Sequence, residues 1–212
     1  TQAQCIQVQE IPLAYPPQRT NDMELTTQQN KVLEQIKAFL KGDASVFIFR
    51  GYAGTGKTTM VKVIADYIKQ NRQLVMMAPT GRAARVLNKK TGHDAVTIHK
   101  AIYGKAHVQP KKVKDVAESE FKFIFPINQS ENGGNIVAIV DEASMVCSRK
   151  IEHELFMFGT DNQMDDLLTF VRPNFGGKVI FVGDPAQLPP VGESVSNALR
   201  AEYFQEKGLK VI

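Results

Sequence analysis

A short segment in the first third of the chain has the residue types and spacing of a phosphate-binding loop. The segment Gly51-Tyr-Ala-Gly-Thr-Gly56-Lys57-Thr58 fits the pattern G-x-x-x-x-G-K-[ST] at every fixed position. Its glycines allow the backbone to curl, so that successive N–H groups converge on phosphate oxygens. We expect Lys57 to contact the β and γ phosphates of a nucleotide and the Thr58 hydroxyl to bind Mg²⁺, which prefers oxygen ligands. The residues expected to contact the nucleotide here are Gly51, Ala53, Gly54, Thr55, Gly56, Lys57, Thr58 and Thr59.

An acidic pair, Asp141-Glu142, directly follows the apolar run Ile136–Val140. Ligands of open α/β sheets bind at the carboxyl ends of the strands, so both carboxylates are expected beside the phosphate loop. We expect Asp141 to bind Mg²⁺, mostly through water, and Glu142 to orient and deprotonate an attacking water. Most Asp-Glu pairs are solvated helix starts, but this one follows a buried strand in a chain with a phosphate loop. The combination indicates hydrolysis of a nucleotide.

Alternating strands and helices are expected to position these groups. Short apolar runs typical of buried parallel strands alternate with segments of helical period, which predicts an α/β fold with a mainly parallel sheet covered by helices on both faces. The expected strands are 45–50, 74–78, 136–140 and 178–182, with the start of a fifth at 209–212. Three helices are expected. The first begins after a cap at Thr26 or Thr27, the second spans 57–69 and the third spans about 82–88.

The composition is that of an ordinary globular domain. The chain has 212 residues, of which 43% are hydrophobic, and a net charge of +4 that permits a polyanionic partner without requiring one. Cys5 and Cys147 are too few for a disulfide framework, and no apolar run approaches the roughly 20 residues of a membrane span. We therefore expect a cytoplasmic protein without membrane contact.

Prolines at 12, 16 and 17 indicate that residues 1–22 form an N-terminal arm before a single domain over 23–212.

Residues 105–135 interrupt the alternation and are expected to form a small inserted accessory module, rich in β structure and outside the main sheet. The segment opens with a basic patch of four lysines, which an aromatic alternation and a turn-rich tripeptide follow. These are Lys105, Lys111, Lys112 and Lys114, then Phe121, Phe123 and Phe125, then Asn132-Gly133-Gly134. We interpret the three phenylalanines as the small core of the module itself, and the lysines as solvated groups that attract a polyanion at low salt.

Further segments follow in the order found in one family, and the chain resembles the first RecA-like motor domain of a superfamily 1 DNA helicase of the RecD-like, 5′-to-3′ branch. The phosphate loop corresponds to its motif I. The other matching segments are Leu25-Thr26-x-x-Gln29-x-x-Val32 (Q motif), Ala78-Pro79-Thr80-Gly81-Arg82-Ala83-Ala84 (motif Ia), Thr97-Ile98-His99-Lys100 (motif Ib), Val140-Asp141-Glu142-Ala143-Ser144-Met145 (motif II) and Val182-Gly183-Asp184-Pro185-Ala186-Gln187-Leu188-Pro189-Pro190-Val191 (motif III).

The resemblance implies a RecA-like P-loop NTPase that uses ATP and Mg²⁺ and moves along single-stranded or fork DNA. It implies that Gln29 reads adenine and that Gln187 contacts the γ-phosphate as part of the catalytic set with Lys57 and Glu142. It also implies a wedge role for the inserted module, with its phenylalanines as an alternative stacking surface for a base. The residues that the family places against single-stranded DNA are Pro79, Thr80, Gly81, Arg82, Thr97 and His99.

The chain departs from the family pattern because no second RecA-like domain follows before Ile212. That domain supplies arginines that stabilise the transferring phosphoryl group, so we expect the chain to be a piece of a longer motor that alone hydrolyses ATP slowly or not at all. The connection 147–177 is longer than expected. Its Asp161, Asp165 and Asp166 are interpreted as a solvated acidic face.

Three alternatives to a helicase motor stay open from the sequence. One is the motor subunit of an exonuclease complex. The sequence shows no cluster of nuclease carboxylates, so a partner would have to supply the cutting activity. Another is a small-molecule kinase, against which stands the lack of an arginine-rich lid segment. The third is a non-catalytic nucleotide-binding scaffold. The helicase and exonuclease-complex readings imply DNA-repair or exonuclease subunits as partners.

Overall fold

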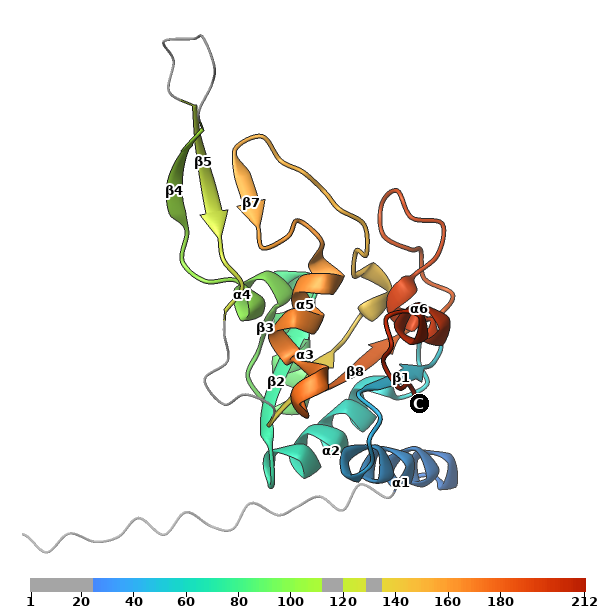
Figure 1. The fold of residues 1–212 in the computed structure, drawn as a ribbon. Helices are drawn as coiled ribbons and strands as arrows, with labels where there is room; N and C mark the ends of the chain where they lie inside the picture. Colours follow the sequence, from blue (N-terminus) through green and yellow to red (C-terminus); the bar gives the residue numbers. More distant parts are fainter. Residues whose placement is uncertain (1–24, 112–119, 129–134) are drawn as a thin grey trace, which may run out of the picture.

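The computed structural model describes residues 25–111, 120–128 and 135–212. The expected arm at 1–22, Cys5, two of the lysines (Lys112 and Lys114) and the tripeptide Asn132-Gly133-Gly134 lie outside these ranges. The helices and strands of Figure 1 are α1 (Thr27–Lys41), β1 (Val46–Arg50), α2 (Lys57–Lys69), β2 (Gln73–Ala78), α3 (Gly81–Thr91), β3 (Ala95–Thr97), α4 (Ile98–Ile102), β4 (His107–Lys111), β5 (Glu120–Phe125), β6 (Ile136–Val140), η1 (Ala143–Met145), β7 (Phe156–Phe158), α5 (Gln163–Val171), η2 (Pro173–Phe175), β8 (Lys178–Gly183), η3 (Asn197–Leu199) and α6 (Ala201–Glu206).

The main sheet has five parallel strands in the order β1-β8-β6-β2-β3, which confirms the predicted α/β class. Every residue of the two central strands, β6 and β8, is buried, as expected for apolar runs covered on both faces. The segment 209–212 lies beside β1, where Val211 forms an isolated parallel bridge with Val46. The prediction missed β3, which is only three residues long and has no apolar run to reveal it.

Alternate residues of each strand supply two separate hydrophobic cores. In β6, Val137 and Ile139 pack into the core beneath α1 and α2, whereas Ile136, Ala138 and Val140 pack into the core beneath α4, α5 and α6. Successive side chains of a strand point to opposite faces, so a fully apolar strand can serve both cores at once. Helices therefore cover both faces of the sheet, as predicted (Figure 1).

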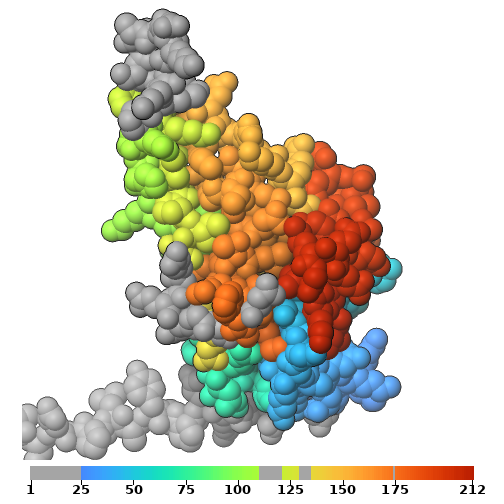
Figure 2. All heavy atoms as spheres, viewed as in Figure 1, coloured from blue at the N-terminus to red at the C-terminus, as the bar shows by residue number. Residues whose placement is uncertain are grey.

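A second sheet, in the order β4-β5-β7, projects from the body of the molecule (Figures 1 and 2). Strands β4 and β5 lie within the segment 105–135, but β7 comes from the connection that follows β6. The interpretation of all three phenylalanines as a core is correct only for Phe125, which stacks on Phe158 at 4.5 Å and packs against the main core. It is wrong for Phe121 and Phe123, which are 51% and 40% exposed, because no described element covers the outer part of this sheet face.

The connection 147–177 contains α5, which the sequence analysis missed, and its acidic residues do not form a solvated face. Asp166 is fully buried and Asp161 is 8% exposed. Asp166 accepts hydrogen bonds from the Tyr103 hydroxyl (2.6 Å), the Thr160 hydroxyl (2.7 Å) and the Thr160 backbone N–H (3.0 Å). These donors replace the water that a carboxylate loses on burial. Only Asp165 agrees with the prediction in part, since it remains partly exposed and pairs with Lys207.

Candidate nucleotide-binding site

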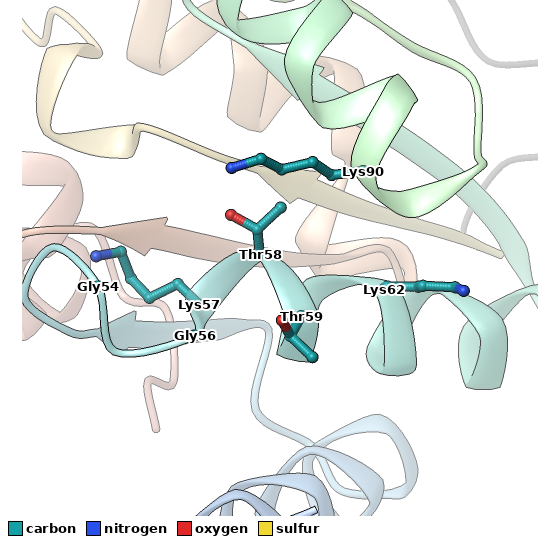
Figure 3. Close-up of a pocket in the computed structure, with 7 residues that line it drawn as sticks. All are labelled: Gly54, Gly56, Lys57, Thr58, Thr59, Lys62 and Lys90. Carbon is teal, nitrogen blue, oxygen red and sulfur yellow. The ribbon is translucent and has the colours of Figure 1, made fainter. Parts of the chain in front are cut away.

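The loop between β1 and α2 borders a cavity of about 480 Å³ (Figure 3). Gly54 and Gly56 both adopt φ of +79°, a left-handed conformation that disfavours side chains and allows the loop to curl back toward the helix. Gly56 is also the N-cap of α2 and has no side chain to cap the first N–H groups of the helix. These N–H groups and the positive end of the helix dipole favour an anion such as phosphate in the cavity. The residues that line it are Gly54, Gly56, Lys57, Thr58, Thr59, Lys62 and Lys90.

Lys57 lies across the loop that it follows. Its ammonium donates hydrogen bonds to the carbonyl oxygens of Gly51 at 2.5 Å and Tyr52 at 2.8 Å. A Cβ at Gly51 would come within 3.2 Å of the Lys57 side chain and 2.9 Å of the Thr55 hydroxyl, so the close approach requires glycine there. Phosphate oxygens of a nucleotide are stronger, charged acceptors for this ammonium than the two carbonyls are.

The acidic pair follows β6 directly, as predicted. Burial raises the pKa of Asp141, against the smaller opposing effects of its backbone hydrogen bond and of Lys57 and Lys90. Burial also raises the pKa of Glu142, and the charge of Asp141 adds to this increase, while Arg82 opposes it. Glu142 adopts φ of +50°, a left-handed conformation that is unusual for a residue with a side chain. The pair is therefore within electrostatic range of Lys57 in the phosphate loop and of Arg82 at the start of α3.

We expect Asp141→Asn to raise the thermal unfolding midpoint of the nucleotide-free protein by a few degrees at pH 7. The unfolded chain ionises Asp141 near its ordinary pKa of 3.8, whereas the folded chain holds the proton to higher pH. Stability therefore falls as the pH rises through the interval between these two values, and the loss persists at neutral pH. Calorimetry at pH 7 and at pH 3 checks this. The gain should shrink at pH 3, and an equal or lower midpoint at pH 7 would contradict it.

Two glutamines from distant segments also lie at this end of the sheet. Gln29 accepts a hydrogen bond from the Thr26 N–H at 3.0 Å, and its amide nitrogen lies 3.2 Å from the position that a Cβ on Gly56 would occupy. Gln29 therefore closes the cap of α1 and lies against the phosphate loop. Gln187, in the loop after β8, accepts a hydrogen bond from the Ser144 hydroxyl at 2.6 Å.

Ser144 is a residue of the site that the sequence analysis did not assign. It is fully buried in η1, two residues beyond the acidic pair, and its hydrogen bond joins the loop after β6 to the loop after β8. Its position two residues after Asp141-Glu142 was the available signal. The cavity also includes Lys62 and Lys90, which no motif marked.

The residues expected against DNA lie after β2 and β3, the next strands along the same edge of the sheet. The Thr80 hydroxyl caps α3 by accepting from the Ala83 N–H (3.1 Å), and the Thr97 hydroxyl caps α4 by accepting from the Lys100 N–H (3.2 Å). Each hydroxyl can still donate its proton to a phosphate oxygen. Pro79, Gly81 and Arg82 belong to the same turn as Thr80, and Gly81 and Arg82 open α3.

His99 is exposed but held by neighbours. Its ring contacts Phe158 edge-on at 5.3 Å between centroids, and Nδ1 lies 3.2 Å from the Gln163 amide nitrogen. Partial burial lowers the pKa of His99, which favours the neutral ring at pH 7. In that form Nδ1 accepts the hydrogen bond from Gln163, and the contact with Phe158 joins α4 to the second sheet.

A phosphate loop between a buried strand and a helix, with an acidic pair on a nearby strand end, defines a P-loop nucleotide-binding protein. A family model described as an AAA domain matches residues 24–207, and the chain belongs to this family. The chain is similar to the ATP-dependent RecD2 DNA helicase of Deinococcus radiodurans, with 32% identity over 169 residues that cover 79% of this chain and 18% of the relative. It is also similar to the ATP-dependent DNA helicase dda of Enterobacteria phage T4, with 26% identity over 87% of this chain and 37% of the relative.

The chain thus spans only a fraction of the length of these relatives. The matches confirm the resemblance to a RecD-like first motor domain that the motifs indicated. Among solved structures, the Pif1 helicase from Bacteroides in complex with ADP-AlF3 and ssDNA aligns with a TM-score of 0.45 and 23% identity, covering 89% of this chain and 38% of that chain. In the part of the chain that the structure describes, no helix has the length and hydropathy needed to cross a membrane.

Proposed function

We propose that the chain is the first motor domain of an ATP-dependent DNA helicase, which binds ATP with Mg²⁺ and couples its hydrolysis to movement along single-stranded DNA. One observation carries the proposal: a single sheet edge holds the phosphate loop, the acidic pair, Gln187 and the capped turns at Thr80 and Thr97. The names of the RecD2 and dda relatives support it. They favour a helicase over a small-molecule kinase or a scaffold without activity.

The residues present fit a magnesium nucleotide. The Thr58 side chain lines the cavity and Asp141 offers a partly buried carboxylate at a nearby strand end, so both supply the oxygen atoms that Mg²⁺ prefers. When bound, the ion would neutralise part of the charge that develops on the phosphates. Lys57 would bind the β and γ phosphates, and Gln29, placed against Gly56, would contact the adenine.

The chemistry of hydrolysis would depend on Glu142 and Gln187. Glu142 would orient the attacking water and accept its proton, a role for which a raised pKa is suited because it makes the carboxylate a stronger base. Gln187 would contact the γ-phosphate. Its hydrogen bond with Ser144 connects that contact to the segment carrying Asp141 and Glu142. A conformational change that follows loss of the γ-phosphate would therefore be transmitted from one loop to the other.

DNA would bind along the turns after β2 and β3. Hydroxyls, backbone amides and an arginine suit contacts with phosphates that hold a strand without reading its sequence. Pro79, Gly81 and His99 would complete this track. The exposed rings of Phe121 and Phe123 would offer a stacking surface at a fork, in keeping with the wedge that the resemblance implies.

The full-length protein would complete the site with a second RecA-like domain. That domain would supply arginines to the cleft and the other half of the DNA track. Exonuclease or DNA-repair subunits as partners, the boundaries of the module at 105–135 and a cytoplasmic location stay predictions. A role as the motor subunit of an exonuclease complex would use this domain in the same way.

The test is the rate of ATP hydrolysis by the full-length protein with and without single-stranded DNA. We expect stimulation of at least about tenfold, because DNA binding closes the cleft around the nucleotide. Double-stranded DNA of the same length serves as the control. Transfer of phosphate to a small acceptor, or turnover that is indifferent to DNA, would contradict the proposal.

A further inference from the structure

The cavity at the phosphate loop has two lysines that neither the motifs nor the proposed mechanism uses. Three lysines line it: Lys57 from the loop motif, Lys62 from the second turn of α2 and Lys90 from the last turn of α3. Lys90 is separated from the loop by α2, β2 and most of α3, so only the packing of α3 beside α2 brings it here. Its presence at the cavity therefore follows from the tertiary structure.

The lysines of the cavity differ in direction. Figure 3 shows the Lys90 side chain extending from α3 past Thr58, with its ammonium on the same side as the Thr58 hydroxyl and the ammonium of Lys57. Lys62 extends the opposite way along α2. Lys57 thus approaches from the loop and Lys90 from α3, and both ammonium groups lie toward the hydroxyl that we expect to bind Mg²⁺, whereas Lys62 points away from it.

The charge of Lys90 already acts on the site. Lys90, like Lys57, opposes the effect of burial on the pKa of Asp141, so its ammonium lies within electrostatic reach of the carboxylate at the end of β6. A simpler reason for a lysine here is the negative end of the α3 dipole, which favours cations in the last helical turn. Lys89 occupies the same turn and satisfies that reason equally, yet it does not line the cavity.

We propose that Lys90 is a second nucleotide-binding lysine, whose ammonium contacts the polyphosphate from the α3 side, opposite Lys57. The proposal rests on the proposed nucleotide site and adds a residue to it. Lys90 and Mg²⁺ neutralise the same cluster of phosphate oxygens, so the lysine contributes most when the metal is absent. The role of Lys90 is then to retain nucleotide while Mg²⁺ is being acquired or lost.

The test is the dissociation constant of ADP and of ATP, measured by calorimetry on the full-length protein with excess EDTA and again with saturating Mg²⁺. We expect Lys90→Gln to weaken binding by about fivefold in EDTA, because one charge-assisted contact to phosphate is lost. With Mg²⁺ the loss should be less than about twofold. Lys90→Arg, which keeps the charge, should bind within about twofold of the unchanged protein in both conditions.

Lys89→Gln is the matched control, since it removes the same charge from the same exposed turn of α3. It should leave the dissociation constants of ADP and ATP unchanged in both conditions. Equal affinities for Lys90→Gln and Lys89→Gln in EDTA would overturn the role of Lys90 and leave the proposed function intact. Absence of nucleotide binding by the unchanged protein would overturn both.

Discussion

Replacing Lys57 by alanine is expected to lower DNA-stimulated ATP turnover by at least about 100-fold in the full-length protein. The lysine is the cation that the motif places against the β and γ phosphates, where negative charge grows as the γ-phosphoryl group transfers. The structure keeps its ammonium at the loop through the carbonyls of Gly51 and Tyr52, so the charge is already in position before the nucleotide binds. Steady-state phosphate release at saturating ATP and single-stranded DNA measures the loss.

Binding of single-stranded DNA without nucleotide should be nearly unchanged in the Lys57→Ala variant. The DNA track proposed here follows β2 and β3 and does not include the phosphate loop. Lys69→Ala is a suitable control, because Lys69 lies on the same helix as Lys57 but at its other end. Turnover within about threefold of the unchanged protein in Lys57→Ala would show that the loop is not the site of hydrolysis.

Replacing Asp166 by alanine is expected to lower the free energy of unfolding by about 3 kcal/mol, the range for a buried hydrogen-bonded charge whose partners lose their acceptor. The carboxylate is fully buried and accepts from Tyr103 and Thr160. The packing around it is tight: a Cβ at Gly159 would come within 2.4 Å of an Asp166 oxygen. Urea unfolding followed by circular dichroism measures the change.

Asp165→Ala provides the control for Asp166→Ala. Asp165 is the preceding residue of α5 and pairs with Lys207 at 2.6 Å, but both side chains are partly exposed. Ion pairs at the surface contribute about 0–1 kcal/mol, so the control should cost much less. Similar losses in the two variants would show that the buried carboxylate is not the origin of the effect.

Asp166 also links stability to the sheet edge that we propose binds DNA. Tyr103, which donates to the carboxylate, directly follows α4 and its ring contacts His99 at 5.5 Å between centroids. Thr160, the other donor, lies just beyond β7 of the second sheet. One buried carboxylate thus holds together α4, α5 and the base of the second sheet.

The positions of the phosphate loop and the acidic pair were predictable because they depend on short segments. The glycine pattern before Lys57 dictates a loop of N–H groups, and an acidic pair after an apolar strand must emerge at the edge where that loop lies. The strands 136–140 and 178–182 were predictable for a related reason, since a continuous apolar run stays out of water only if both of its faces are covered. In β8 the structure extends this run by one residue, to Gly183.

The features that sequence reasoning missed depend on residues far apart in the chain. Asp166 has the spacing of a solvated helix residue. Its burial is possible only because Tyr103 and Thr160, which are distant or outside the helix, donate hydrogen bonds to its carboxylate. The pairing of β7 with β5 leaves Phe123 beside Phe156 on a face that is partly exposed, an outcome that alternation alone does not reveal.

The sequence by itself determined that this chain has a phosphate loop, an acidic pair and an α/β sheet to carry them, because backbone geometry and hydrophobic period are local properties. Tertiary structure decided which side chains support that chemistry. It joined Ser144 to Gln187 across two loops and brought Lys90 to the cavity from the end of α3. Such contacts arise from the packing of whole helices and strands, which fixes the distance between residues that no local pattern connects.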